Sequence, residues 1–229
     1  LLLQIAAHEQ AIPLSDLYRA CEIARELCNA HMVGRVIARP YVGDPGNFTR
    51  TTNRRDYSYP LPGETVLDRL TAAGIPVTAV GKIDDVFAGR GISRSAHSED
   101  NAAAQDSLIQ LVRDHADGLI FVNLIDFDML YGHRRDFTGY ARALESFDKV
   151  LGRIVGMLSA GDLLIITADH GNDPTFKGTD HTREYVPLLA FRMGRPGVSL
   201  GIRNGFYDIA QSLSSFFGIP PMPLGRSFL

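Results

Sequence analysis

The stretch LLIITADHGNDPTFKGTDHTREYVP, residues 163–187, joins an uninterrupted apolar run to a cluster of aspartate and histidine side chains. Residues Leu163–Ile166 are predicted to form a parallel strand buried on both faces, because such strands are continuous apolar runs. Asp169 and His170 then lie at the carboxyl end of that strand, where open α/β sheets bind their ligands. His181 follows after a loop rich in glycine and polar residues. Carboxylate and imidazole suit zinc, manganese or iron, so the stretch indicates a metal site.

A simpler interpretation is a polar turn, in which Asp169 caps the backbone and His170 lies at the surface. A second stretch argues against that interpretation. Residues 118–128, GLIFVNLIDFD, form another apolar run that ends in acidic residues and is followed by His133. Because parallel strands present their carboxyl ends at one edge of a sheet, the two clusters are predicted to meet. Together they favour a site for two metal ions.

The first part of the chain combines one helix with β-rich sequence. Residues 15–28, SDLYRACEIARELC, place apolar side chains on one helical face, which predicts an amphipathic helix capped by Ser15 or Asp16. A β-rich segment follows from Gly34 to Tyr41, and YPLPG at residues 59–63 then interrupts any regular element.

We therefore expect a domain boundary in this interruption, with one domain over residues 1–60 and another over residues 61–229. The second domain should alternate helices with strands, which predicts an α/β fold whose parallel sheet is covered on both faces. The helices are predicted at 64–73, 101–115, 138–158 and 207–217, and the strands at 76–80, 119–124, 163–166 and 186–191.

Composition limits the kinds of partner. The 229 residues carry a formal net charge of −3, so no broad basic field is available for nucleic acid. No apolar run approaches the roughly 20 residues that cross a bilayer. Cys21 and Cys28 lie two helical turns apart, about 10 Å by helical rise, which is too far for a disulfide. We expect a chain that binds neither nucleic acid nor membranes and works in the reducing cytoplasm.

The two metal stretches, taken with two others, resemble the bacterial phosphopentomutases, a family of the alkaline phosphatase superfamily. The similar stretches are HMVGRVIARPYVGDPGNFTRT at 31–51, VGKIDDVFAGRGI at 80–92, NLIDFDMLYGHRRD at 123–136 and TADHGNDPTFKGTDHTRE at 167–184. They occur in order along essentially the whole chain. The resemblance implies an alkaline-phosphatase-like parallel-sheet sandwich core, incomplete here, with part of a smaller α+β cap domain.

The resemblance also implies a reaction and a ligand set. Members interconvert ribose 1-phosphate and ribose 5-phosphate, or the deoxyribose equivalents, with two Mn²⁺ ions, other divalent ions being possible, and a phosphorylated threonine. By position, Asp128, His133 and His181 would hold one ion, and Asp169 with His170 would contribute to the other. The threonine nucleophile and a further aspartate are expected upstream, so this chain alone is expected to be inactive. The intact protein is expected to be a monomer acting on a small sugar phosphate.

Arginines gather in the first part of the chain, and their planar guanidinium groups match phosphate oxygens. Five of them stand at positions 35, 39, 50, 54 and 55. By resemblance, Arg35 and Arg50 would bind the distal phosphate of a pentose bisphosphate, with Lys82 reaching in from the second domain. For Arg54 and Arg55 the favoured interpretation is a solvated surface charge.

Two matters stay open from the sequence. Asp126 is either a residue that orients a metal ligand or a strand-end acid that faces solvent. Paired Asp and His ligands are also shared by metal-dependent phosphate or sulfate ester hydrolases and by cofactor-independent phosphoglycerate mutases. A third alternative is a non-catalytic product that binds metal and sugar phosphate without turnover.

Overall fold

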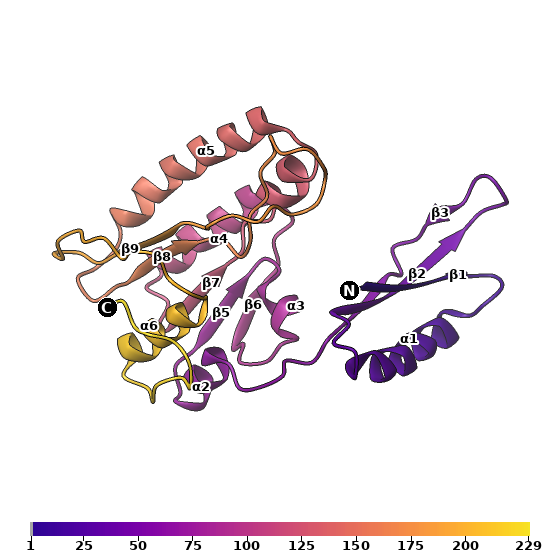
Figure 1. Cartoon of the computed structure of the whole chain (residues 1–229), viewed down its shortest axis with the longest axis horizontal. Helices are drawn as coiled ribbons and strands as arrows, with labels where there is room; N and C mark the ends of the chain where they lie inside the picture. The colour runs from indigo at the N-terminus through magenta and orange to yellow at the C-terminus, as the bar shows by residue number, and fades with distance from the viewer. Residues whose placement is uncertain (1) are drawn as a thin grey trace. The chain divides into compact units, whose positions relative to one another are not determined.

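The computed structural model describes residues 2–229, which form two compact units, residues 2–63 and residues 64–229 (Figure 1). Both units combine helices with strands, and the larger contains a parallel sheet, so the predicted α/β class is confirmed. No helix among these residues is both long and apolar enough to cross a membrane. The roles of the units as cap and core remain predictions.

The smaller unit is a four-stranded sheet with one helix. β2 pairs in parallel with β1 and antiparallel with both β3 and β4. The helix α1 connects the two parallel strands, as a parallel pair requires a crossover. The elements are β1 Leu2–His8, α1 Leu14–Asn29, β2 Arg35–Val42, β3 Thr49–Arg50 and β4 Arg55–Ser58.

One face of this sheet is covered by α1. Leu17 and Cys21 of the helix pack against Val36 and Ala38 of β2, all of them buried. The predicted helix is confirmed, but the predicted cap at Ser15 or Asp16 is wrong. The helix begins at Leu14 after Pro13, and no side chain caps it. A proline fixes φ near the helical value, so the helix starts earlier than the polar residues suggested.

The larger unit contains two sheets. β6, β5 and β7 form a parallel sheet with β5 at its centre, and β8 pairs with β9. Its helices are α2 Val66–Ala72, α3 Ile83–Phe87, α4 Asn101–Arg113, the π-helix η1 Phe127–Gly132, α5 Phe137–Val155 and α6 Tyr207–Phe217. Its strands are β5 Val77–Val80, β6 Arg94–Ala96, β7 Leu119–Val122, β8 Leu164–Thr167 and β9 Leu188–Phe191. The short elements α3 and β6 were not predicted.

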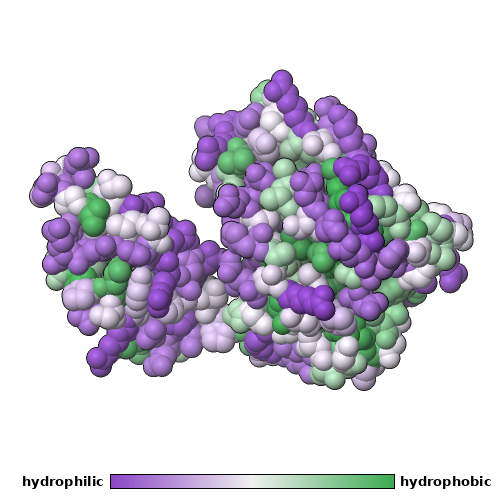
Figure 2. All heavy atoms as spheres, turned by 180° about the vertical axis from the view of Figure 1, so that it is seen from behind, coloured by the Kyte–Doolittle hydropathy of each residue, from purple (hydrophilic) through white to green (hydrophobic). Residues whose placement is uncertain are grey.

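The strand expected at Leu163–Ile166 is present but is neither parallel nor buried on both faces. β8 runs antiparallel to β9 in a sheet of two strands, and its residues are half-buried or exposed. Leu189 and Phe191 of β9 are 60% and 39% exposed, and Figure 2 shows such apolar residues at the surface between polar ones. An apolar run encodes neither the direction nor the number of its partners, so the prediction failed at this point.

β5 is buried along its whole length. All four of its residues are buried, and Val77 packs with Leu67 and Leu70 of α2. The turn before β7 requires Gly118, which has φ +85°, and a Cβ there would lie 2.0 Å from the Pro76 carbonyl oxygen. The close approach aligns β7 beside β5, from which the chain continues into η1.

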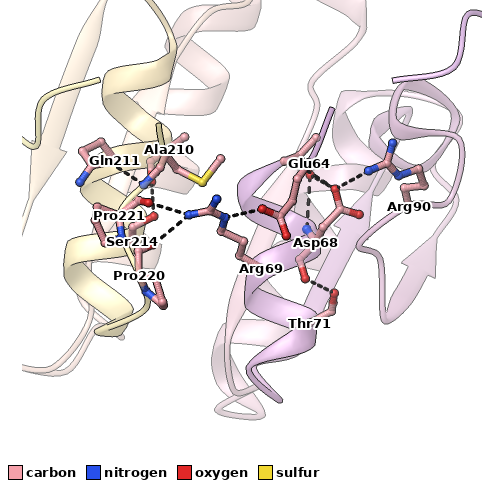
Figure 3. Close-up of polar contacts among 12 residues, drawn as sticks. Glu64, Asp68, Arg69, Thr71, Arg90, Ala210, Gln211, Ser214, Pro220 and Pro221 are labelled. Carbon is pink, nitrogen blue, oxygen red and sulfur yellow. Dashed lines mark hydrogen bonds and ion pairs between the residues drawn. The ribbon is translucent and has the colours of Figure 1, made fainter. Parts of the chain in front are cut away.

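The amino end of α2 is fixed by side-chain hydrogen bonds. Thr65 and Asp68 form a capping box: the Thr65 N–H donates to the Asp68 carboxylate at 2.7 Å, and the Asp68 N–H donates to Thr65 Oγ1 at 3.3 Å. Arg90 adds a bond to the same carboxylate at 2.8 Å (Figure 3). On the other side of the helix, Arg69 donates to the Pro221 carbonyl at 2.6 Å and so holds the segment after α6 against α2.

These contacts lower the pKa of the Asp68 carboxyl: burial acts to raise it, but hydrogen bonds from Thr65 and the charge of Arg90 outweigh burial. Ionised Asp68 therefore stabilises the folded state. That contribution is complete above the unfolded-state pKa of about 3.9 and is lost as the pH falls through the lower folded-state pKa.

Replacing Asp68 by Asn should lower the free energy of unfolding by roughly 1 kcal/mol at neutral pH, because the charge-assisted cap is lost. The difference between the two proteins should shrink below about pH 4. Urea denaturation followed by circular dichroism at both pH values measures it. Glu64→Gln is the control: the Glu64 side chain is 54% exposed in its pair with Arg69, so little change is expected. A pH-independent Asp68→Asn difference would contradict the assignment.

Candidate metal centre

The π-helix η1 places Asp128 and His133 side by side. The His133 N–H donates to the Asp128 carbonyl at 3.1 Å, a hydrogen bond that spans five residues and closes one wide turn. The two side chains therefore point to one side, with His133 Nε2 3.3 Å from Asp128 Oδ2. An ordinary α-helix brings residues three and four apart together instead. π-Turns of this kind recur at functional sites.

The loop between β8 and β9 brings two more imidazoles to the same carboxylate. A single bridge joins Gly171 to Thr182, whose N–H donates to the Gly171 carbonyl at 3.0 Å. It folds the loop back so that His181 Nε2 lies 3.2 Å from Asp128 Oδ1. The His170 ring stacks on the His181 ring with centroids 3.7 Å apart. Asp128 is thus the point at which η1 and the loop meet.

Glycines permit these approaches. A Cβ on Gly171 would lie 2.7 Å from the Thr182 carbonyl oxygen, so a larger residue would open the bridge. A Cβ on Gly132 would lie 2.4 Å from the Asn172 carboxamide. That carboxamide donates to Asp128 Oδ1 at 2.5 Å, so Gly132 makes room for a residue that orients the carboxylate.

A contact with a backbone carbonyl also favours one tautomer of His133. Its Nδ1 lies 2.5 Å from the Thr179 carbonyl, an acceptor, so Nδ1 carries the proton. Nε2 is then the ring nitrogen that a neutral His133 would offer to a metal ion. His170 Nδ1 similarly lies 3.2 Å from the Gly171 carbonyl.

These donors fit a divalent ion. Asp128, His170 and His181 each offer one ligand atom within 4.8 Å of the others. Two donors that each lie about 2.0–2.1 Å from a tetrahedral ion are roughly 3.3 Å apart, close to the separations of Asp128 from His133 and His181. The side chains are about one-third to one-half exposed, so the cluster is open to solvent.

The surroundings of the cluster are acidic. Tyr140 on α5 is half-buried nearby, and the pKa of its hydroxyl is raised first by burial and then by the carboxylates of Glu184, Asp128 and Asp173. The hydroxyl therefore remains protonated at neutral pH. Three carboxylates close to the imidazole cluster create a negative potential, which favours a bound cation.

The other predicted site residues are placed differently. The Asp169 side chain is 76% exposed and lies 3.6 Å from His170 Nε2, outside the cluster around Asp128. Lys82 stands before α3, and its ammonium lies 3.1 Å from Met129 Sδ in η1. Arg35, in the smaller unit, pairs with Asp56 at 3.3 Å. Arg50 lies on β3 of the same unit.

Asp126 is buried, so the interpretation as a solvent-facing acid is wrong. Only 7% of the residue is exposed, and its Oδ2 accepts the N–H of Asn101 at 2.9 Å. In turn, the Asp126 N–H donates to the Asn101 side-chain oxygen at 3.0 Å. The reciprocal pair fixes the first residue of α4 to the segment that leads into η1. Asp126 therefore positions Asp128 through the backbone.

Sequence reasoning missed Asn172, Thr182 and Tyr140. Asn172 and Thr182 lie within the stretch that indicated the metal site, yet their residue types suit any polar turn. Tyr140 is 12 residues from Asp128 in sequence and on a different helix. Only Asn172 could have been identified from the sequence, because it follows the predicted ligand His170 and the turn residue Gly171.

His181→Ala should remove one proposed ligand of the metal ion. The affinity for divalent ions should fall by more than the roughly 10–100-fold that is typical when a residue that orients a ligand is changed. The fold should be retained, because the ring is about half exposed. Metal content after dialysis and isothermal titration with Mn²⁺ measure the effect, and His31→Ala is the matched control because His31 is exposed in the smaller unit. Equal metal content in all three proteins would exclude His181 as a ligand.

Gly132→Ala should displace the Asn172 carboxamide and release Asp128 from its hydrogen bond. We expect about a tenfold loss of Mn²⁺ affinity, as for other residues that orient a ligand. The control is Gly152→Ala on α5, where a Cβ meets no atom within 4 Å. That variant should keep its affinity and gain some stability, since alanine favours a helix more than glycine. Unchanged affinity in Gly132→Ala would show that Asn172 does not matter.

Comparison with known proteins identifies the family of the chain. Residues 28–221 match the family described as the metalloenzyme superfamily. The chain is 54% identical over 228 residues to the phosphopentomutase of Caldanaerobacter subterraneus subsp. tengcongensis, covering 99% of this chain and 58% of that protein. It is 50% identical over 232 residues to the Levilactobacillus brevis phosphopentomutase, covering 100% and 59%. The chain thus spans less than two-thirds of the length of these curated relatives.

A solved structure supports the fold. The phosphoglycerate mutase of Leishmania mexicana superposes with a TM-score of 0.56 at 17% identity, covering 70% of this chain and 38% of that one. At this identity the likeness concerns fold alone. The resemblance to phosphopentomutases that the motifs indicated is confirmed by the relatives at about 50% identity.

Proposed function

Since this chain belongs to the metalloenzyme superfamily, we propose that it forms the metal-binding and substrate-binding part of a phosphopentomutase, which interconverts ribose 1-phosphate and ribose 5-phosphate or the deoxyribose equivalents. The observation that carries the proposal is the agreement between relatives and geometry. The alignment with a phosphopentomutase covers 99% of this chain at 54% identity, and the chain gathers Asp128, His133, His170 and His181 into one cluster.

The metal ligands follow from that cluster. We propose that Asp128, His133 and His181 hold one divalent ion, and that Asp169 with His170 contributes to a second. His170 also reaches the Asp128 group, so it stands between the two proposed ions. When bound, two such ions supply charge neutralisation for a phosphoryl group in transfer. The chain's own residues contact Nδ1 of His133 and His170 through backbone carbonyls, and Asn172 keeps the Asp128 carboxylate oriented.

The substrate contacts are proposed from the cationic side chains. Arg35 and Arg50 would bind the distal phosphate, and Lys82 would approach from the segment before α3. Lys82 lies beside Met129 of η1, the turn that carries Asp128, which supports its place near the metal cluster. We assign the threonine nucleophile and the remaining aspartate to the part of the relatives that this chain does not cover.

The metal ion, the cellular location and the oligomeric state are also proposals. Manganese is the proposed ion, because mixed carboxylate and imidazole ligands suit it. Cys21 and Cys28 are free thiols, which supports a reducing cytoplasm, where we place a role in nucleoside catabolism. We also propose that the protein acts as a monomer.

The test is an assay with ribose 1-phosphate and Mn²⁺ on the 229-residue chain and on the complete protein encoded by its gene. We expect the complete protein to form ribose 5-phosphate without releasing inorganic phosphate, and the chain alone to show no turnover. His181→Ala in the complete protein should lower kcat/KM by about 100-fold or more, because a direct ligand is lost.

The products separate the alternatives. Release of inorganic phosphate as the main product would replace the mutase proposal with an ester hydrolase. Conversion of 3-phosphoglycerate but not of ribose 1-phosphate would favour a phosphoglycerate mutase. Binding of ribose 5-phosphate with no turnover in any form of the protein would favour a non-catalytic role.

A further inference from the structure

A methionine and a lysine meet beside the candidate metal centre. Lys82 follows β5, and Met129 lies in η1, which follows β7. β5 and β7 lie side by side in the parallel sheet (Figure 1). The Lys82 Nζ lies 3.1 Å from the Met129 Sδ, although the two residues are 47 positions apart in the chain. The contact therefore depends on the pairing of the two strands.

Gly81 allows Lys82 to stand at this place. The glycine has φ +80°, and a Cβ on it would lie 2.7 Å from the Asn123 carbonyl oxygen. Glycine alone combines that left-handed conformation with so close an approach to the chain after β7. Lys82 therefore leaves β5 beside the segment that leads into η1, and its long side chain reaches Met129.

Met129 is a weak partner for an ammonium group. A thioether sulfur is uncharged and accepts hydrogen bonds poorly, so it leaves the positive charge of Lys82 in place. Lys82 is exposed and makes no salt bridge with any residue that the structure describes. The adjacent carboxylate of Asp128 contacts His133 and His181 instead. The contact thus holds a full positive charge beside the metal centre without cancelling it.

The sulfur of Met129 is accessible to small oxidants, because the residue is 39% exposed. Hydrogen peroxide oxidises a thioether by two electrons and gives a polar methionine sulfoxide. The sulfur attacks one oxygen, the O–O bond breaks, and the leaving hydroxide takes the proton of the transferred hydroxyl to become water. A dithiol reductant reverses the change, and the products are the thioether, a disulfide and water.

We propose that Met129 is a site of reversible oxidation that controls the ammonium group of Lys82. A sulfoxide oxygen is a strong acceptor, so it replaces a weak N–H···S contact with a charge-assisted hydrogen bond from the same ammonium. Oxidised Met129 then holds Lys82 on η1, whereas reduced Met129 releases it to an anion at the metal centre. The identity of that anion as a sugar phosphate rests on the proposed function, but the oxidation does not.

The other methionines lack this combination of exposure and partner. Met32 and Met193 are 74% and 46% exposed, so peroxide reaches them as well. Neither sulfur forms a hydrogen bond within the described part of the chain, where Met157 and Met222 are half-buried. Oxidation at these four positions should therefore leave Lys82 unchanged.

The experiment treats the 229-residue chain with hydrogen peroxide in EDTA, which prevents radical formation by bound metal ions. Peptide mass spectrometry locates the sulfoxides, and competitive acetylation then compares Lys82 with the two other lysines, Lys149 and Lys177. Oxidation should slow the acetylation of Lys82 by about threefold or more, because a charge-assisted bond occupies its ammonium. The other two rates should stay constant, and a methionine sulfoxide reductase supplied with a dithiol should restore the rate of Lys82.

Three variants test the assignment. Met129→Leu keeps the volume but removes the sulfur, so peroxide should no longer affect Lys82. Met129→Gln places a permanent amide oxygen there and should slow Lys82 without peroxide, which gives a second test if Met129→Leu fails to fold by circular dichroism. Met193→Leu is the matched control, because Met193 is similarly exposed in the same unit, and it should still show the slowing.

Two results would overturn the proposal. One is an equal effect of peroxide on Lys82 in Met129→Leu and in the unchanged chain. The other is oxidation of Met193 with none at Met129, or oxidation of Met129 that leaves the rate of Lys82 unchanged. Because no turnover is measured, a failed mutase assay would leave the result intact.

Discussion

The carboxylate of Asp128 is the interaction on which the candidate site depends. Its two oxygens lie 3.3 and 3.2 Å from imidazole nitrogens of His133 and His181. The first imidazole follows η1 in the same segment, and the second arrives on a loop almost 50 residues later in the chain. One acidic group therefore ties a local turn to a distant loop, and the cluster exists only while both are in place.

Several uncharged residues hold that meeting point together. Asn172 orients one oxygen of Asp128, Gly132 leaves space for Asn172, and the bridge from Gly171 to Thr182 returns the loop. None of these residues contributes a carboxylate or an imidazole. Their contribution is geometric, because a metal site tolerates only small errors in the position of its donors. The site thus consists of a few donor residues and of neighbouring residues that hold those donors in position.

The arginines of the smaller unit likewise differ in the groups that they contact. Arg55 pairs with Ala38 on the sheet face that α1 covers, whereas Arg39, the next residue of β2, faces the other side, since alternate residues of a strand face opposite sides. Arg55 stacks on an aromatic ring on the helix side, and Arg35 and Arg54 share Asp56. Arg39 and Arg50 remain in a pocket with an unpaired N–H. Counting arginines predicts a basic region, whereas the partner of each arginine depends on how the strands pair.

The amino-acid sequence by itself determined the α/β class, the helix predicted over residues 15–28, the strand predicted over residues 76–80 and the stretches that carry the Asp and His donors. These follow from local periodicity and residue chemistry, which are readable along the chain. Only the tertiary structure decided that β8 pairs antiparallel with β9, that Asp126 is buried against Asn101, and that η1 is a π-turn which aligns Asp128 with His133. Strand partners, burial and the pitch of a single turn depend on contacts between segments far apart in sequence. Short-range patterns cannot specify them, because the same apolar run or acidic residue is compatible with several surroundings.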